Sequence, residues 1–279
     1  MVHYPVSGRI QVSQIFIGTS GFSYDDWKGN FYPDGVESMD YLYFYSKSFN
    51  TVEINFTYYR FPGRSVFFGM CEKIRNAGTF VFSVKANKIF THQRDYTLTD
   101  ARNFTDALKP LKDNARLGSI LFQFPYSFRC CSENLGYLAA LSESFSGYDI
   151  CVEFRNVLWL KEKVLKVMHD YNIGFCNVDE PQISGLLPQT DICTSETGYL
   201  RFHGRNSMSW WNNEKAYQRY DYMYSMLELK EWIPKMKNIT ASSKKTFVYF
   251  NNHYKGKAAK SALMFLDILK TENIYTSQN

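Results

Sequence analysis

The sequence predicts an α/β fold, a TIM (β/α)8-type barrel in a single domain. Three observations support this prediction: eight short apolar runs rich in β-branched and aromatic residues, helical patterns between most of them, and no linker that would divide the 279 residues. Barrels of about 250 residues commonly form one domain, and 45% hydrophobic residues suffice for a packed core. An open doubly wound sheet of similar content is the alternative.

The eight runs are almost continuously apolar, as parallel strands buried on both faces require. In chain order they are IFIG from residue 15, TVEI from 51, TFVFSV from 79, SILFQF from 119, DICVEF from 149, IGFCNV from 173, YLRF from 199 and KTFVYF from 245. We therefore expect one domain over residues 1–279, with its core strands within about residues 15–250.

Helical patterns lie between these runs and after the last one. They cover residues 39–48, 65–75, 100–112, 132–145, 158–171 and 224–237, and a C-terminal helix covers about 257–270. The sixth connection, DEPQISGLLPQTDICTSET, contains two prolines and a glycine that interrupt any helical pattern. We expect this crossover to be irregular.

Charge and cysteine content set limits on the class of protein. A formal charge of +5 and a pI near 8.7 permit an acidic or phosphorylated partner without requiring nucleic acid. The six cysteines show no C-x-x-C spacing, so we expect reduced thiols. There is no secretory h-region and no apolar run of membrane-spanning length, so we expect a cytoplasmic protein without membrane contact. The sequence gives no indication of the oligomeric state.

Polar side chains follow nearly every predicted strand at its carboxyl end. They are Ser20, Glu53, Asn55, Lys85, Gln123, Glu153, Arg155, Asp179, Arg201, His203, Asn251, Asn252 and His253. In a parallel barrel these ends emerge on one face, so they would line a single pocket. Tyr59, His92 and Arg205 lie in loops close enough to reach it. Unpaired buried polar groups are costly, so we expect these groups to satisfy one another or to hold a ligand.

Four of these residues are candidates for chemistry: Glu53, Glu153, His203 and Lys85. Histidine and carboxylates can exchange protons, although a single histidine after a strand is often only a wall residue. Lys85 near Arg155 and Arg201 would have a lowered pKa, which suits a Schiff-base nucleophile or an anion clamp formed with both arginines; we favour the clamp. Glu53 could equally be a structural counter-ion to either arginine.

The remaining residues are candidate ligand contacts. They are Ser20, Asn55, Tyr59, His92, Gln123, Arg155, Asp179, Arg201, Arg205, Asn251, Asn252 and His253. Asn251 and Asn252 could instead cap loops, because asparagine commonly satisfies local backbone groups.

A metal site is a separate possibility. Glu53, Glu153, Asp179, His203 and His253 could converge on a cation. However, the chain has no H-E-x-x-H or comparable signature, and the nearby lysine and arginines would repel a bare cation. We therefore predict no metal ligands. No glycine-rich phosphate loop is present, and the sequence identifies no cofactor.

Seven motifs in order carry a resemblance that spans almost the whole chain: GTSGFSYDDWKGNFYP, VEINFTYYRFP, FSVKANKIFTH, LFQFPYSF, VEFRNVLW, YLRFHGRN and YFNNHYKGKA. With these motifs the sequence resembles the YecE-like family, domain of unknown function 72. The resemblance implies a TIM barrel but no defined reaction. The likeness of that barrel to endonuclease IV and sugar isomerases suggests phosphodiester or sugar chemistry by analogy alone.

The resemblance also implies a set of motif positions. They are Gly18, Ser20, Gly21, Trp27, Glu53, Asn55, Tyr59, Lys85, Thr91, His92, Gln123, Glu153, Arg155, Arg201, His203, Gly204, Arg205, Asn251, Asn252 and His253. The chain departs from the family pattern at Phe22, where tryptophan is usual, at Phe56, where a small polar residue is usual, and at Asn156, where histidine commonly follows the arginine. A mechanism that needs this last histidine does not transfer to the chain.

The co-facial cations, carboxylates and histidine favour an enzyme that acts on a small anionic ligand, phosphorylated or carboxylated. Two alternatives stay open. One is a metal-dependent phosphodiesterase or endonuclease-like activity on nucleic acid, and the other is a non-catalytic module that binds nucleic acid or a metabolite.

Overall fold

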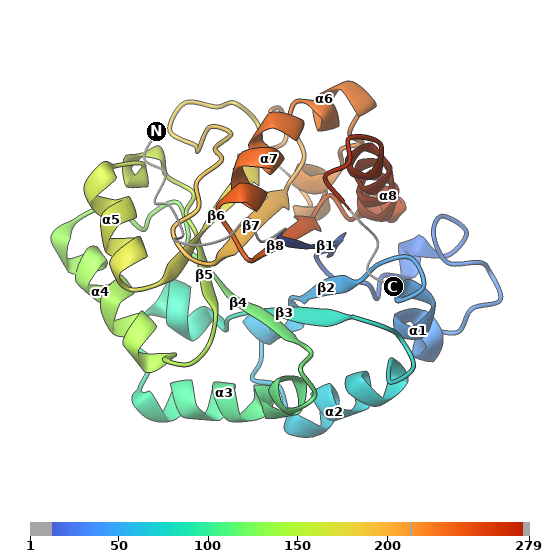
Figure 1. The fold of residues 1–279 in the computed structure, drawn as a ribbon, viewed down its shortest axis with the longest axis horizontal. Coiled ribbons are helices and arrows are strands. Elements are labelled where there is room, and N and C mark those ends of the chain that lie inside the picture. The colour runs from blue at the N-terminus through green and yellow to red at the C-terminus, as the bar shows by residue number, and fades with distance from the viewer. Residues whose placement is uncertain (1–12, 213, 276–279) are drawn as a thin grey trace.

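Eight parallel strands form the centre of the molecule in a computed structural model that describes residues 13–212 and 214–275. They are β1 (Gln14–Thr19), β2 (Thr51–Ile54), β3 (Val81–Lys85), β4 (Leu117–Gln123), β5 (Ile150–Glu153), β6 (Ile173–Asp179), β7 (Thr197–Phe202) and β8 (Lys245–Phe250). Neighbours in sequence pair from β2 to β8, and β8 pairs with β1. The predicted TIM-type barrel is confirmed, with helices around the strands (Figure 1).

The helices pack outside the strands in the predicted alternation. They are α1 (Tyr41–Tyr45), α2 (Arg64–Lys73), α3 (Leu98–Asp113), α4 (Ser132–Ser144), α5 (Glu162–Asp170), α6 (Met226–Lys230), α7 (Ile233–Ala241) and α8 (Lys257–Thr271). The single helix expected over residues 224–237 is wrong: α6 ends at Lys230 and a second helix begins at Ile233. Pro234 is the second residue of α7 and lies in the first turn, where its missing N–H costs nothing. Along the described residues, no helix combines the length and the apolar character needed to cross a membrane.

The sixth connection is irregular, as predicted, with no helix between β6 and β7. The Asn177 side chain, which points out of the barrel, holds this connection in place with three hydrogen bonds. Its Oδ1 accepts from the Ile192 N–H at 2.9 Å and from the Thr190 hydroxyl at 2.8 Å. Its Nδ2 donates to the Ile192 carbonyl at 2.9 Å. One outward side chain of β6 therefore fixes the course of this loop.

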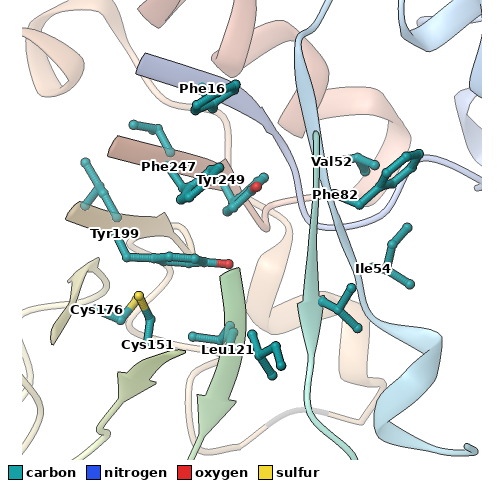
Figure 2. Close-up of a cluster of buried hydrophobic side chains, with 14 of the residues drawn as sticks. Phe16, Val52, Ile54, Phe82, Leu121, Cys151, Cys176, Tyr199, Phe247 and Tyr249 are labelled. Atoms are coloured by element: carbon teal, nitrogen blue, oxygen red, sulfur yellow. The ribbon is translucent and has the colours of Figure 1, made fainter. Parts of the chain in front are cut away.

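Inward-pointing aromatic residues fill the barrel interior beneath the carboxyl ends of the strands. Phe16 stacks on Phe247 with ring centroids 5.0 Å apart, and Tyr199 and Tyr249 lie next to them (Figure 2). The Tyr249 hydroxyl bonds to the hydroxyls of Thr51 at 2.6 Å and Ser83 at 2.8 Å. These packed side chains fill the barrel interior beneath the carboxyl ends of the strands.

The barrel is closed between β1 and β2 by side-chain hydrogen bonds, where a continuous ladder of backbone hydrogen bonds would otherwise be expected. These two strands share only the isolated bridge between Ser20 and Glu53. The Tyr45 hydroxyl accepts from the Thr19 N–H at 2.8 Å and lies 3.1 Å from the Thr51 carbonyl, to which it can donate. Asn50 Oδ1 accepts from the Ile17 N–H at 2.9 Å, and Asn50 Nδ2 donates to the Ile15 carbonyl at 3.0 Å. Backbone groups that would otherwise be unpaired are thus satisfied.

Replacing Tyr45 by phenylalanine is expected to destabilise the protein by about 2 kcal/mol, because buried backbone groups of both strands lose their partner. The measurement is the free energy of unfolding in urea. Tyr41→Phe is the matched control on the same helix, since the buried Tyr41 hydroxyl has no partner among the described residues. Equal losses for both variants would contradict a bridging role for Tyr45.

Candidate functional site

A cavity of about 540 Å³ lies over the carboxyl ends of the strands. Eight residues predicted from the sequence line it: Asn55, Tyr59, Lys85, Gln123, Arg155, Arg201, Asn251 and His253. The rest of the lining is Gly21, Phe22, Ser23, Tyr24, Ile54, Phe56, Tyr58 and Tyr220. The convergence expected from a parallel barrel therefore brings residues from six strand ends to one opening.

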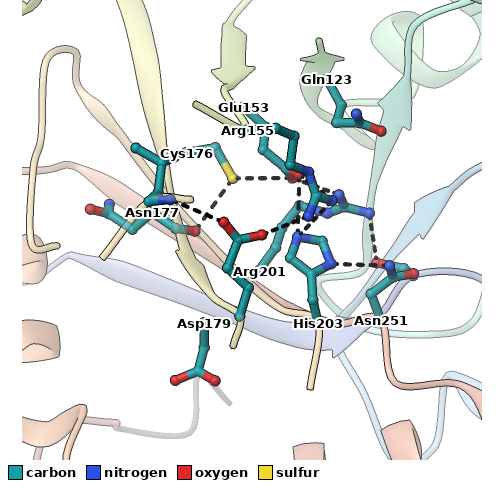
Figure 3. Close-up of polar contacts among 12 residues, drawn as sticks. Gln123, Glu153, Arg155, Cys176, Asn177, Asp179, Arg201, His203 and Asn251 are labelled. Carbon is teal, nitrogen blue, oxygen red and sulfur yellow. Dashed lines mark hydrogen bonds and ion pairs between the residues drawn. The ribbon is translucent and has the colours of Figure 1, made fainter. Parts of the chain in front are cut away.

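A chain of buried ion pairs forms the floor of this cavity (Figure 3). Arg201 Nη2 lies 2.8 Å from Glu53 Oε1, and Arg201 Nη1 lies 2.6 Å from Glu153 Oε2. Arg155 continues the chain with Nη2 at 2.7 Å from Glu153 Oε1 and Nη1 at 2.7 Å from Glu180 Oε2. Arg201 is only 2% exposed, and the three carboxylates are fully covered. Each terminal nitrogen of both arginines thus faces a carboxylate.

His203 lies beside this chain and is neutral at physiological pH. Its Nε2 lies 3.2 Å from Glu153 Oε1, and its Nδ1 lies 3.1 Å from Asn251 Nδ2. Asn251 Nδ2 can only donate, so Nδ1 accepts from it, while Nε2 lies 3.2 Å from both Glu153 Oε1 and the Arg155 Nη2 donor. Burial, together with the charge of Arg155, lowers the pKa of His203 to about 3.

The two carboxylates next to Arg155 have opposite pKa shifts. Burial alone would raise both values. For Glu153, Arg155 and Arg201 outweigh burial and hold the pKa well below its usual range. For Glu180, burial dominates and raises the pKa to about 7, because Arg155 is the one cation paired with it. Glu153 is therefore a fixed negative charge, whereas Glu180 titrates near neutral pH.

Lys85 differs from the arginines because its ammonium group pairs with no carboxylate of the described residues. Nζ donates to Gln123 Oε1 at 2.8 Å and lies over the Tyr58 ring at 4.6 Å from its centroid. Burial and the charge of Arg201 lower the pKa of Lys85 to about 8. The lysine is still mainly charged at neutral pH, and it faces the cavity.

Two buried polar atoms of lining residues have no hydrogen-bond partner among the described residues. They are the acceptor Asn55 Oδ1 and the donor Arg201 Nε. Unpaired buried polar atoms are uncommon in folded proteins and call for a specific explanation. Both atoms are covered by their neighbours, so they lie just beneath the cavity surface and do not open onto it.

Several predicted residues lie outside the cavity. Glu53, Glu153, His203 and Ser20 are buried beneath it, and His92 is exposed beside the Tyr58 ring. Asp179, Arg205 and Asn252 point away from the barrel interior: Asp179 binds Arg205 and Trp232, and Asn252 binds Ser261 of α8. Figure 3 shows Asp179 apart from the ion-pair chain. We do not place these last three residues among the ligand contacts, because side chains alternate along a strand.

Sequence reasoning missed Glu180, which belongs to the ion-pair chain, and the cavity residues Tyr24 and Tyr220. Glu180 follows Asp179 directly, and it is in phase with Cys176, which lies inside the barrel. The segment CNVDE shows this alternation once the phase is known. The aromatic lining residues come from loops, where the sequence gives no comparable pattern.

Metal-ligating side chains are not grouped at the site. Along residues 13–212 and 214–275, no three histidine, cysteine or acidic side chains are arranged to hold a metal ion. At the cavity floor the carboxylates are instead engaged by arginines.

The fold and the site define a β/α-barrel protein with a charged cavity at the carboxyl ends of its strands. The chain belongs to the family described as protein of unknown function DUF72, whose model matches residues 16–278, and this agrees with the resemblance seen in the motifs.

Relatives and solved structures support this membership. The chain is 32% identical over 275 residues to the UPF0759 protein YunF of Bacillus subtilis, covering 92% of this chain and 95% of that protein. A DUF72 family structure from Thermotoga maritima matches with a TM-score of 0.83 and 38% identity, covering 92% of this chain and 99% of the other. A DUF72 family structure from Enterococcus faecalis matches with a TM-score of 0.81 and 25% identity, covering 95% of this chain and 97% of the other.

Glu180 and His203 are expected to contribute to stability with opposite pH dependence. The folded pKa of His203, about 3, lies below the unfolded value, so its contribution weakens as the pH falls from about 6.5. The folded pKa of Glu180, about 7, lies above the unfolded value, so its contribution grows as the pH falls from 7 toward about 4.3.

Single variants should separate these two contributions. Relative to wild type, Glu180→Gln should lose stability more steeply as the pH falls from 7 to 5, and His203→Gln less steeply, by up to about 1.4 kcal/mol per pH unit in each case. Urea denaturation at several pH values measures these slopes. Slopes that change in the same direction for both variants would contradict the assignment.

Proposed function

We propose that the chain is an enzyme acting on a small molecule with one anionic group, a carboxylate or a phosphate, which Lys85 binds. The observation that carries this proposal is the Lys85 ammonium group in the cavity without a carboxylate partner. A cation held in a partly buried site by one neutral amide and one aromatic face favours an anionic ligand.

The sequence predicts that Lys85, Arg155 and Arg201 bind the anion together, whereas this proposal assigns the anion mainly to Lys85. Arg155 and Arg201 are counter-ions of Glu53, Glu153 and Glu180, so they have little charge left for a ligand. Arg201 Nε has no partner among the described residues, but it is covered and does not reach the cavity. Lys85 is therefore the main electrostatic contact.

The other parts of the ligand are suggested by the cavity wall. Tyr24 and His253 stack with centroids 4.7 Å apart, and Phe22, Tyr58 and Tyr59 add further aromatic surface. We infer a ligand with an anionic group and surface that packs on aromatic rings.

Glu153 and His203, which the sequence suggests for proton exchange, have a positioning role in this proposal. Glu153 stays ionised and His203 stays neutral around neutral pH, and both are covered by the arginines and Asn251. We assign them to positioning Arg155, Arg201 and Asn251. Lys85, with a pKa of about 8, is the lining residue best suited to exchange a proton with a ligand. The cytoplasmic location stays a prediction of the sequence.

Lys85→Met should abolish the thermal stabilisation that small carboxylates or phosphates give to the wild-type protein. The expected loss of affinity is about tenfold or more, since a hydrogen bond to a charged group contributes about 1.5–3 kcal/mol. A thermal-shift panel that includes inorganic phosphate measures it. Lys88→Met, on an exposed lysine three residues after Lys85, is the control. Unchanged shifts in Lys85→Met would end the proposal, and borohydride capture of a carbonyl compound at Lys85 would indicate a Schiff-base nucleophile instead.

Binding of the same anions should weaken at alkaline pH. Above the Lys85 pKa of about 8 the ammonium group loses its proton, so the affinity should fall by about tenfold per pH unit. Isothermal titration calorimetry between pH 7 and 10 tests this with any anion that the panel identifies. An affinity that stays constant across this range would show that the lysine charge is not what binds the anion.

A further inference from the structure

A second hollow of about 380 Å³ adjoins the cavity on the side of α1 and α2. We call it the side groove and define it by Phe22, Met39, Leu42, Val66, Gly69 and Met70. Phe22 and Ser23 line both the cavity and the side groove. The two spaces are therefore neighbours that share one wall.

The walls of the side groove are mainly apolar and uncovered, with Ser23, Ser38 and Ser65 as its uncharged polar lining. Leu42 at its base is buried, whereas Met39 is 66% exposed and Val66 39% exposed. Its charged lining residue is Lys73, whose ammonium group donates to the Met39 carbonyl at 2.8 Å. Covering such apolar surface is favourable, so a groove of this kind suits an apolar group.

Gly69 is a second observation that points to an occupant. It lies within α2, where glycine weakens a helix relative to alanine. Apart from its chain neighbours and the backbone of its own helix, no atom of the described residues lies within 4 Å of the position that a Cβ would take, so their packing does not require a glycine. The missing side chain leaves the side groove open at this point.

We propose that the side groove binds the apolar end of the ligand whose anionic group lies at Lys85. This inference rests on the proposed function, and the wall shared at Phe22 and Ser23 supports one molecule that occupies both spaces. The substrate class is then an amphipathic carboxylate or phosphate, with an aliphatic or aromatic tail that passes Phe22.

A series of straight-chain carboxylates from acetate to octanoate tests the proposal by isothermal titration calorimetry. In the wild-type protein the affinity should rise by about threefold for each methylene that enters the groove, slightly less than full burial would give. Gly69→Leu should fill the groove, so that the affinity no longer rises with chain length while acetate binds as in wild type. Leucine is a good helix former, so α2 is retained.

Gly136→Leu is the matched control, because Gly136 also lies within a helix, α4, with no atom within 4 Å of its Cβ position, and it lines neither space. This variant should keep the wild-type dependence on chain length. Octanamide, which lacks the charge, should bind much more weakly than octanoate.

The outcomes separate this inference from the proposed function. Short carboxylates that bind through Lys85 without any gain along the series would overturn the inference and leave the proposed function standing. If no carboxylate or alkyl phosphate binds in a Lys85-dependent way, both fail. Long-chain binding that Gly69→Leu removes but Lys85→Met leaves unchanged would show that the groove has a separate occupant, such as a partner protein, and would also overturn the proposal.

Discussion

The arrangement of the carboxyl face depends on the buried ion-pair chain that Arg201 and Arg155 form with three glutamates. It connects the ends of β2, β5 and β7 with the residue that follows β6. The net stability gained from a buried ion pair is often small, but removing one partner costs about 3–5 kcal/mol because the other charge is left unpaired. The chain therefore acts chiefly as a constraint: strand ends that brought these charges into any other register would leave an unpaired charge in the core.

The same constraint accounts for the special position of Lys85. Because the carboxylates at the floor are used by arginines, Gln123 and the Tyr58 ring are the partners of the lysine within the described part of the chain. Its charge is directed to the cavity, while the arginine charges are neutralised locally. Three cations line the cavity, but two of them are neutralised by carboxylates, so Lys85 is the cation whose charge is available to an anion. Residue type alone would not have shown this, since the difference depends on which atoms face each other.

The sequence was sufficient for the fold and for much of the cavity, but not for the phase of each strand. Strands of a barrel are buried on both faces, so they read as continuous apolar runs without the alternation that separates inside from outside. Asp179 was therefore chosen as a site residue, although Glu180 is the one that points inward. The Tyr45 bridge between β1 and β2 had no signal either, because it joins a helix to two strands. The irregular sixth crossover, in contrast, followed directly from its prolines and glycine.

Charge balance would couple the binding of the proposed anion to the protonation of Glu180. With all groups ionised, Glu53, Glu153 and Glu180 balance Lys85, Arg155 and Arg201, so a bound anion would add one uncompensated negative charge. Glu180, with a pKa near 7, can take up a proton at little cost and remove that charge. By reciprocity, an anion that raises the pKa of Glu180 must bind more tightly when Glu180 is protonated. Arg155 lines the cavity and contacts Glu180, so it is the physical connection between the two events.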